Sequence, residues 1–183
     1  LHLSLRRQRQ MCIRDRYREV YVNAWKYIKR AIKYADDNDI GVLIDMHGAY
    51  GSQNAQPHSG VNNGKADFFN DFNENKMTKL LVWLVQELED VSNVIGIELL
   101  NEPHNTKRLW KWYSRTMDAM RKAQTKSRDM PLYFHDAFSP SQGAEFASKR
   151  NDFVVQDTHS YFVYTQQDRD MSCLLYTSPS PRD

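Results

Sequence analysis

Apolar and polar positions along the chain follow two periods that alternate from one segment to the next. Apolar residues that recur every three or four positions are typical of an amphipathic helix. Short uninterrupted apolar runs are typical of strands buried on both faces. The first pattern predicts helices at 17–37, 77–88, 109–120 and, as a short turn, 144–149. The second predicts strands at 41–46, 94–100, 131–134 and 153–157.

The order of these segments decides the fold class. Helices and strands alternate from residue 17 to residue 157, which predicts an α/β fold with a parallel sheet of right-handed βαβ units. Periodicity alone also allows 94–100 to be a short buried helix. Asn105 or Thr106 can cap the helix that follows it. A polar loop at 48–64 is long enough to indicate a functional segment rather than a simple connection.

Each predicted strand ends in side chains that can do chemistry. These are His47, the Asn101–Pro103 stretch, the His135–Asp136 pair, and His159 with Tyr161. Because the carboxyl ends of parallel strands meet at one rim, we expect the four groups to converge there, as they do in (β/α) barrels. Two simpler interpretations stay open: Asn-Glu-Pro as a loop with an exposed glutamate, and each histidine as a structural residue.

Composition narrows the class of protein. At 183 residues and 40% hydrophobic, the chain suits one globular domain with a sizeable core. The formal net charge is only +2, and an arginine-rich stretch at 1–16 accounts for it, so 17–171 is slightly acidic. We therefore expect the protein to bind neither nucleic acid nor a charged membrane surface. No apolar run approaches the ~18 residues that a membrane span requires.

The two ends differ from the body in composition. Residues 1–16 and 172–183 have no helical or strand period, so we expect a non-native or disordered flank at each end and a single domain at 17–171. Residues 1–16 also lack the features of a signal peptide. Cys12 and Cys173 fall in or beside these flanks, which leaves no basis for a disulfide or a cysteine metal site.

Residues 17–171 lack sequence motifs for binding a nucleotide or a metal ion. No glycine-rich phosphate loop follows a predicted strand, which argues against a nucleotide-binding doubly wound sheet. The histidines do not form a His-x-x-x-His or Glu-x-x-His pattern. We therefore expect no metal and no cofactor.

The strand-end motifs together resemble glycoside hydrolase family 5, the retaining β-glycanases built on (β/α)8 barrels. Asn101–Pro103 is similar to the signature at the end of that family's fourth strand. The stretches Asp45–Ala49, Gly51–Asn54, His135–Phe138 and His159–Tyr161 look like the fungal exo-β-1,3-glucanase branch. The resemblance covers about residues 20–165 and is most specific in the loop after the first predicted strand.

This resemblance implies roles for individual residues. Glu102 would be the general acid/base, and Asn101 would hydrogen-bond the 2-hydroxyl of the sugar. His47 would contact the sugar in subsite −1. His159 and Tyr161 would lie at the end of the sixth barrel strand, with Tyr161 beside the nucleophile.

Other positions agree with the branch only in part. Tyr164 falls where the branch has one of two aromatic residues that clamp the glucan at the pocket mouth. Its partner position holds Gln56, followed by Pro57 and His58, instead of an aromatic residue and Asp-Asn. These differences bear on the acceptor site. We expect His135–Asp136 to support the site from behind and Tyr50, Phe138 and Phe162 to be further stacking candidates on rim loops.

The nucleophilic glutamate of the family ends the seventh strand, and the predicted strands correspond to the third to sixth. We therefore expect a partial TIM (β/α)8 barrel, truncated at both ends, that is inactive as it stands. Glu98 is a poor substitute nucleophile because four residues of strand separate it from Glu102 by about 13 Å. A buried carboxylate paired inside the barrel is the simpler interpretation of Glu98.

The resemblance implies a β-glucan substrate, a monomer, and a secreted or cell-wall location. The first interpretation of the chain is that it is a fragment of an exo-β-1,3-glucosidase. Another family 5 β-glycanase, such as an endo-β-1,4-glucanase or a mannanase, is the alternative, and the 48–60 loop distinguishes them by closing or opening the cleft. Two possibilities remain: a glucan-binding protein without catalysis, and a polypeptide with no function of its own.

Overall fold

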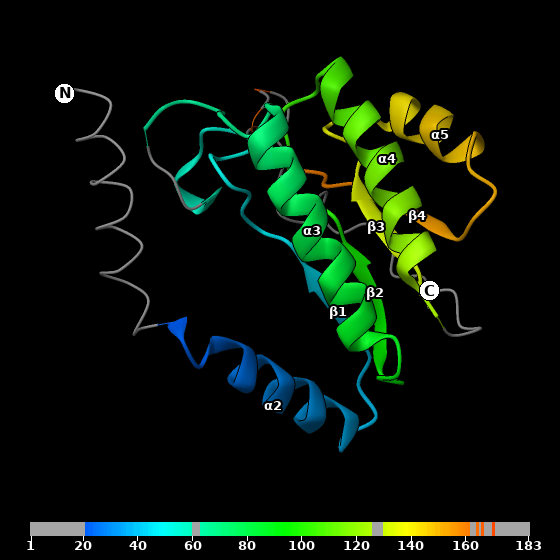
Figure 1. The fold of residues 1–183 in the computed structure, drawn as a ribbon. Helices are drawn as coiled ribbons and strands as arrows, with labels where there is room; N and C mark the ends of the chain where they lie inside the picture. Colours follow the sequence, from blue (N-terminus) through cyan, green and yellow to red (C-terminus); the bar gives the residue numbers. More distant parts are fainter. Residues whose placement is uncertain are drawn as a thin grey trace.

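The computed structural model describes residues 21–59, 63–125, 130–161, 164, 166 and 170. Both predicted flanks lie outside the described residues. Four strands form one parallel sheet in sequential order, β1-β2-β3-β4, with a helix in each crossover (Figure 1). The strands are β1 Val42–Asp45, β2 Val94–Glu98, β3 Leu132–His135 and β4 Val154–Asp157. The predicted α/β fold with sequential parallel strands, the arrangement found in part of a (β/α) barrel, is therefore confirmed.

The helices are α2 Ala24–Asp36, α3 Asp71–Leu88, α4 Lys107–Ala123 and α5 Pro140–Ser148, with a short 3-10 helix η1 at Pro57–Ser59. Helices α3, α4 and α5 begin earlier than their apolar patterns predict, α4 by only two residues. The Asn70 side chain accepts a hydrogen bond from the Asn73 amide and so starts α3 at Asp71. Pro140 occupies the first turn of α5, a favoured proline position. None of the described helices combines the length and the apolar surface that a membrane span requires.

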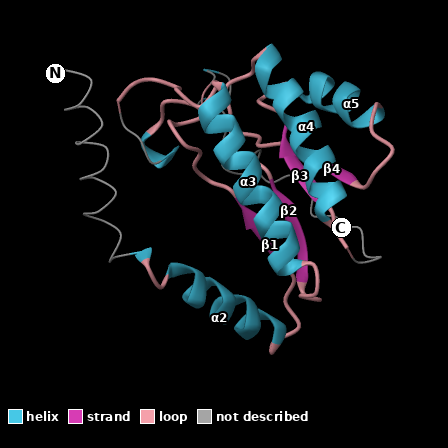
Figure 2. Ribbon diagram, in the orientation of Figure 1, coloured by secondary structure: helices cyan, strands magenta, loops and turns pink. Residues whose placement is uncertain are grey.

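Helices α3 and α4 cover one face of the sheet (Figure 2). Trp112 and Tyr113 of α4 are fully buried against Phe134 of β3 and the other apolar side chains of that layer. The Trp112 indole donates to Thr78 Oγ1 at 3.1 Å, which ties α4 to α3. These aromatic residues belong to the core.

The opposite face of the sheet carries polar groups. Asp45 pairs in register with Glu98, and Glu98 with Tyr133, so their side chains point to the same side. Gly96 lies on this face as well, because a Cβ there would collide with the Tyr133 ring and the Pro131 carbonyl. All four strands run in one direction, so their carboxyl ends form a single rim. Strand β2 ends at Glu98, two residues before the predicted Leu100.

Candidate active site

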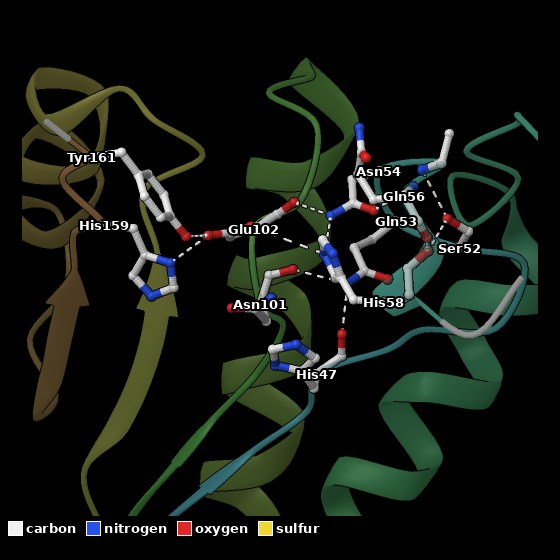
Figure 3. A network of polar contacts seen from close by, with 12 residues as sticks. His47, Ser52, Gln53, Asn54, Gln56, His58, Asn101, Glu102, His159 and Tyr161 are labelled. Carbon is white, nitrogen blue, oxygen red and sulfur yellow. Dashed lines mark hydrogen bonds and ion pairs between the residues drawn. The ribbon is translucent and has the colours of Figure 1, made fainter. Parts of the chain in front are cut away.

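Glu102 lies at the rim just beyond β2, and its side chain is only 15% exposed. Its Oε1 accepts a hydrogen bond from His159 Nδ1 at 2.7 Å and another from the Tyr161 hydroxyl at 2.5 Å (Figure 3). His159 and Tyr161 follow β4, so residues more than fifty positions apart in sequence meet at one carboxylate. The structure thus brings together three of the residues that the sequence placed at the rim.

His159 lies between two carboxylates. Its Nδ1 faces Glu102, and its Nε2 lies 3.0 Å from Asp157 Oδ2. A carboxylate accepts hydrogen bonds, so the two contacts favour the doubly protonated imidazolium form of the ring. Burial alone would lower the pKa of His159, but the two carboxylates outweigh it and raise the pKa above its usual value.

The pKa of Glu102 moves in the direction opposite to the one its proposed role requires. Burial raises it, but the hydrogen bonds from His159 and Tyr161 outweigh burial, so the pKa lies below its ordinary value. A general acid must stay protonated near the working pH, which burial beside a like charge would favour. His159 and Tyr161, which hydrogen-bond Glu102 Oε1, are both donors and stabilise the ionised carboxylate, which explains the difference.

His47 and Asn101 lie below Glu102 in the view of Figure 3. His47 follows β1 and is largely exposed, with its Nδ1 2.8 Å from Asp45 Oδ2. Asn101 is buried, and its main-chain N–H donates to the Met46 carbonyl at 3.1 Å. Both therefore stand at the same rim as Glu102, one reaching toward solvent and one held within the fold.

His135 and Asp136 are fully buried and do not line the cleft. Asp136 accepts hydrogen bonds from the Phe138 amide at 2.9 Å and the Thr158 hydroxyl at 2.7 Å. His135 Nδ1 accepts from the Ala137 amide at 3.0 Å. These bonds hold a turn in which Ala137 and Phe138 have φ of 53° and 58°, conformations that cost free energy for residues other than glycine. The pair shapes the loop that carries Phe138 into the cleft.

One potential metal-ligand atom from each of Glu102, His135 and His159 lies within 4.8 Å of the other two, a spacing that could hold a metal ion. The hydrogen bonds argue against it. His135 Nδ1 accepts from Ala137, so the proton of the neutral ring is on Nε2. Both nitrogens of His159 are committed to carboxylates. A metal ion could bind only if these hydrogen bonds were broken, so this donor set does not fit a metal as the side chains stand.

A cleft of about 840 Å³ opens at the rim, with Glu102, His159 and Tyr161 in its wall. Phe138 and Tyr164 also line it, and the Tyr161 and Tyr164 rings lie 5.6 Å apart. Aromatic faces beside a carboxylate suit a sugar, whose C–H groups pack on rings while its hydroxyls bind polar groups. Tyr50, also expected to stack, instead lies 5.2 Å from the Lys76 ammonium, and Phe162 lies outside the described residues.

A second hollow, of about 810 Å³, lies between α4 and α5 on the helical side of the sheet. Four of its charged groups are already paired with one another: Arg150 with Asp118 at 2.7 Å and Arg121 with Asp152 at 2.8 Å. The convergence of strand ends therefore favours the rim cleft as the site.

Sequence reasoning assigned no role to several residues at the site. His58 Nε2 lies 4.0 Å from Glu102 Oε2 and accepts a hydrogen bond from Asn54 at 3.0 Å. Gln53 and Asn54 bind the main chain of Asn101 and Glu102. The only signal for them was their place in the most family-like loop, because such contacts join segments 48 positions apart.

Comparisons with known proteins identify the family of this chain. The model of the cellulase family, glycosyl hydrolase family 5, matches residues 11–176. Glucan 1,3-beta-glucosidase 3 of Schizosaccharomyces pombe is 31% identical over 152 residues, covering 81% of this chain and 32% of that protein. Glucan 1,3-beta-glucosidase I/II of Saccharomyces cerevisiae is 30% identical over 156 residues, covering 80% of this chain and 34% of that protein.

The chain thus spans about a third of the length of these curated relatives. Among solved structures, a rutinosidase from Aspergillus niger superposes with a TM-score of 0.64 at 16% identity, covering 79% of this chain and 46% of that one. AoRut gives the same TM-score at 17% identity, covering 78% and 44%. These likenesses show the fold, and the family match shows that the chain belongs to glycosyl hydrolase family 5.

Proposed function

We propose that this chain is part of a retaining β-glycoside hydrolase that acts on β-1,3-glucan, with Glu102 as its general acid/base. The observation that carries the proposal is the position of the Glu102 carboxylate. It is held at the carboxyl end of a buried strand, in the wall of a cleft lined by aromatic rings. The glucan 1,3-beta-glucosidases among its relatives support the choice of substrate.

Retention requires two carboxyl groups about 5–5.5 Å apart. Glu102 protonates the glycosidic oxygen while a second carboxylate attacks the anomeric carbon, so the C–O bond breaks and a glycosyl ester forms. Water then hydrolyses the ester after Glu102 removes its proton, which releases sugar of the original configuration. Asn101 hydrogen-bonds the 2-hydroxyl, and this bond strengthens as positive charge develops on the ring.

The second carboxylate comes from outside strands β1 to β4. Glu98 is about 13 Å away along β2, and Asp157 is committed to the far nitrogen of His159. We therefore infer that a longer polypeptide supplies this group and that the chain does not hydrolyse glucan alone. A nucleophile beside Glu102 would raise the pKa of Glu102, because two nearby carboxylates resist being ionised together. The pKa appropriate to an acid thus depends on the part that completes the site.

The remaining site residues act on the substrate. His47 contacts the sugar in subsite −1, and Tyr164 packs against the glucan at the mouth of the cleft. His159 and Tyr161 hold Glu102 in place and release Oε1 when substrate enters. Gln56 and His58 line the acceptor side of the cleft, so the sugar accepted there differs from the one a two-ring clamp would choose. The complete enzyme is a monomer that acts outside the cell or at the cell wall.

The test is hydrolysis of laminarin by the full-length polypeptide, with Glu102→Gln as the control. Terminal glucose should be released, and proton NMR at early times should show the β-anomer. The 183-residue chain should release none above the Glu102→Gln control. Glucose appearing first as the α-anomer would contradict the retaining mechanism.

Two other outcomes separate the alternatives. Cleavage of β-1,4-glucan or mannan in preference to laminarin would make this an endo-acting or mannan-specific member of the family. Binding of laminarin without hydrolysis by the full-length polypeptide would make it a glucan-binding protein. In either case the proposed substrate or activity would be wrong.

A further inference from the structure

Two neighbouring amide side chains, Gln53 and Asn54, are buried in the loop that follows β1. Gln53 Nε2 donates to the carbonyls of His47 at 3.0 Å and Asn101 at 2.9 Å, while its Oε1 accepts from the Ala49 amide at 3.0 Å. Asn54 Nδ2 donates to the Glu102 carbonyl at 2.9 Å. The loop therefore holds the main chain of two consecutive site residues just beyond the next strand, β2 (Figure 3).

The segment that these amides hold has an unfavourable backbone conformation. Glu102 has φ of 43°, in the left-handed region that residues other than glycine rarely adopt. Pro103 follows it, and a residue before proline prefers extended conformations. Such conformations cost about 1–3 kcal/mol and persist only where the surroundings impose them. Local sequence thus opposes the conformation at Glu102, and distant contacts must maintain it.

The contacts that maintain it come from the same loop. Besides the two amide bonds, the Gln53 carbonyl accepts from the His104 amide at 3.1 Å, just beyond Pro103. The loop is itself fixed, since Ser52 Oγ accepts from the Ala55 amide at 2.8 Å and shares a hydrogen bond with Ser59 Oγ. Main-chain groups on both sides of Glu102 are therefore attached to one internally bonded loop.

The direction of a side chain depends on the φ of its own residue. If Glu102 relaxed to an extended conformation, its carboxylate would leave His159 and Tyr161 and no longer point across the cleft. Gln53 cannot bind a sugar instead, because it is fully buried and both its amide hydrogens are already donated. Asn54 likewise donates both hydrogens, the second to His58 Nε2 at 3.0 Å.

We propose that Gln53 and Asn54 are positioning residues that impose the left-handed backbone of Glu102 and so aim its carboxylate at the bond to be cleaved. The inference rests on the proposed role of Glu102 as acid/base. It adds a cause for the geometry: the loop after β1, and not the sequence around Glu102, determines where the acid points.

The test uses the full-length polypeptide and the near-isosteric variants Gln53→Met and Asn54→Leu. The measured quantity is the ratio of kcat/KM for a laminari-oligosaccharide to kcat/KM for the first step with dinitrophenyl β-glucoside. The first substrate needs a proton donor and the second does not. The ratio is independent of how much enzyme is folded, so residual activity is sufficient. We expect it to fall about 10–10²-fold in each variant, the usual effect of misplacing a catalytic group by about 1 Å.

Gln86→Met, an exposed position on α3, is the matched control and should leave the ratio unchanged. If the Gln53 and Asn54 variants lower both activities by the same factor, the two amides are merely structural and the inference is wrong. Glu102→Ala separates the two claims. A ratio that does not change in Glu102→Ala overturns the acid/base role itself, whereas a ratio that changes only in Glu102→Ala overturns the positioning role alone.

Discussion

The two faces of the four-stranded sheet are made of different side chains. The face under α3 and α4 is apolar, with Ile97, Leu132 and Phe134 fully buried against the helices. The other face carries the carboxyl groups of Asp45, Glu98 and the β4 residue Asp157. Helical packing satisfies the first face within this chain. The second face brings several carboxyl groups together. Clustered like charges are unfavourable in a core and are typical of a functional site.

Two carboxyl groups show the same contrast through their pKa values. Burial, the negative charges of Asp157 and Asp45, and a hydrogen bond to Asp157 raise the pKa of Glu98 to about 8. Asp152 lies in the connection between α5 and β4, next to Arg121 of α4. Burial opposes its ionisation, but hydrogen bonds from Arg150 and Arg121 lower its pKa to about 2. Partners, and not burial alone, determine the charge of each group.

The largest effect on folding should come from the apolar face. Trp112→Ala removes a fully buried ring that contacts Phe68 and Tyr113, and its loss leaves a cavity. We expect the free energy of unfolding to fall by about 3–5 kcal/mol, measured by urea denaturation. Trp83→Ala, whose ring is 39% exposed on α3, is the control and should cost clearly less. Equal losses would mean that the helical layer is not the main core.

The second prediction concerns the polar face. Because the folded pKa of Glu98 is about 8 and its unfolded value is near the ordinary 4.5, folding favours the protonated form. The stability it contributes is complete below about pH 4.5 and is lost as pH rises through about 8, a change on the order of a few kcal/mol.

Glu98→Gln keeps a neutral side chain at every pH and should flatten that fall in unfolding free energy. Denaturation curves of the 183-residue chain between pH 5 and 9 check it, with the exposed Glu87→Gln as control. A variant that keeps the wild-type pH slope would show that Glu98 is ionised in the folded chain.

The smallest effect should come from the arginine-paired carboxylate. A depressed folded pKa means that Asp152 stabilises the protein above about pH 4 and that this contribution disappears as pH falls toward 2. Asp152→Asn should therefore lower the unfolding free energy by about 1–2 kcal/mol at pH 7, with the difference shrinking in acid. Asp118→Asn, 65% exposed and bound only to Arg150, should cost less. A pH-independent difference would contradict the pairing.

The apolar face could be predicted from sequence because its determinants are local. The four strands and the helices that cover them follow from apolar periods, and the Thr106 cap of α4 from a capping residue before an apolar pattern. Boundaries were less accurate where polar residues extend an element. Helix α5 begins at Pro140 and not at Ala144, because its first turn has no apolar stripe.

The rim was predictable only in part. Polar residues after each strand indicated that Glu102, His159 and Tyr161 would meet, and the structure brings them together. The backbone conformation of Glu102 and the direction of its pKa were not predictable. Both depend on contacts between segments far apart in the chain, from Asn54 in one case and His159 in the other.

The central claim, that Glu102 is the acid/base, is tested most directly by Glu102→Ala in the full-length polypeptide with two leaving groups. Hydrolysis of a β-1,3 bond should fall by about 10²–10⁴-fold, the usual contribution of a positioned proton donor. The first step with dinitrophenyl β-glucoside should survive, because that leaving group needs no proton. Added azide should then restore turnover and yield a β-glucosyl azide. Equal loss on both substrates, with no azide product, would contradict the assignment.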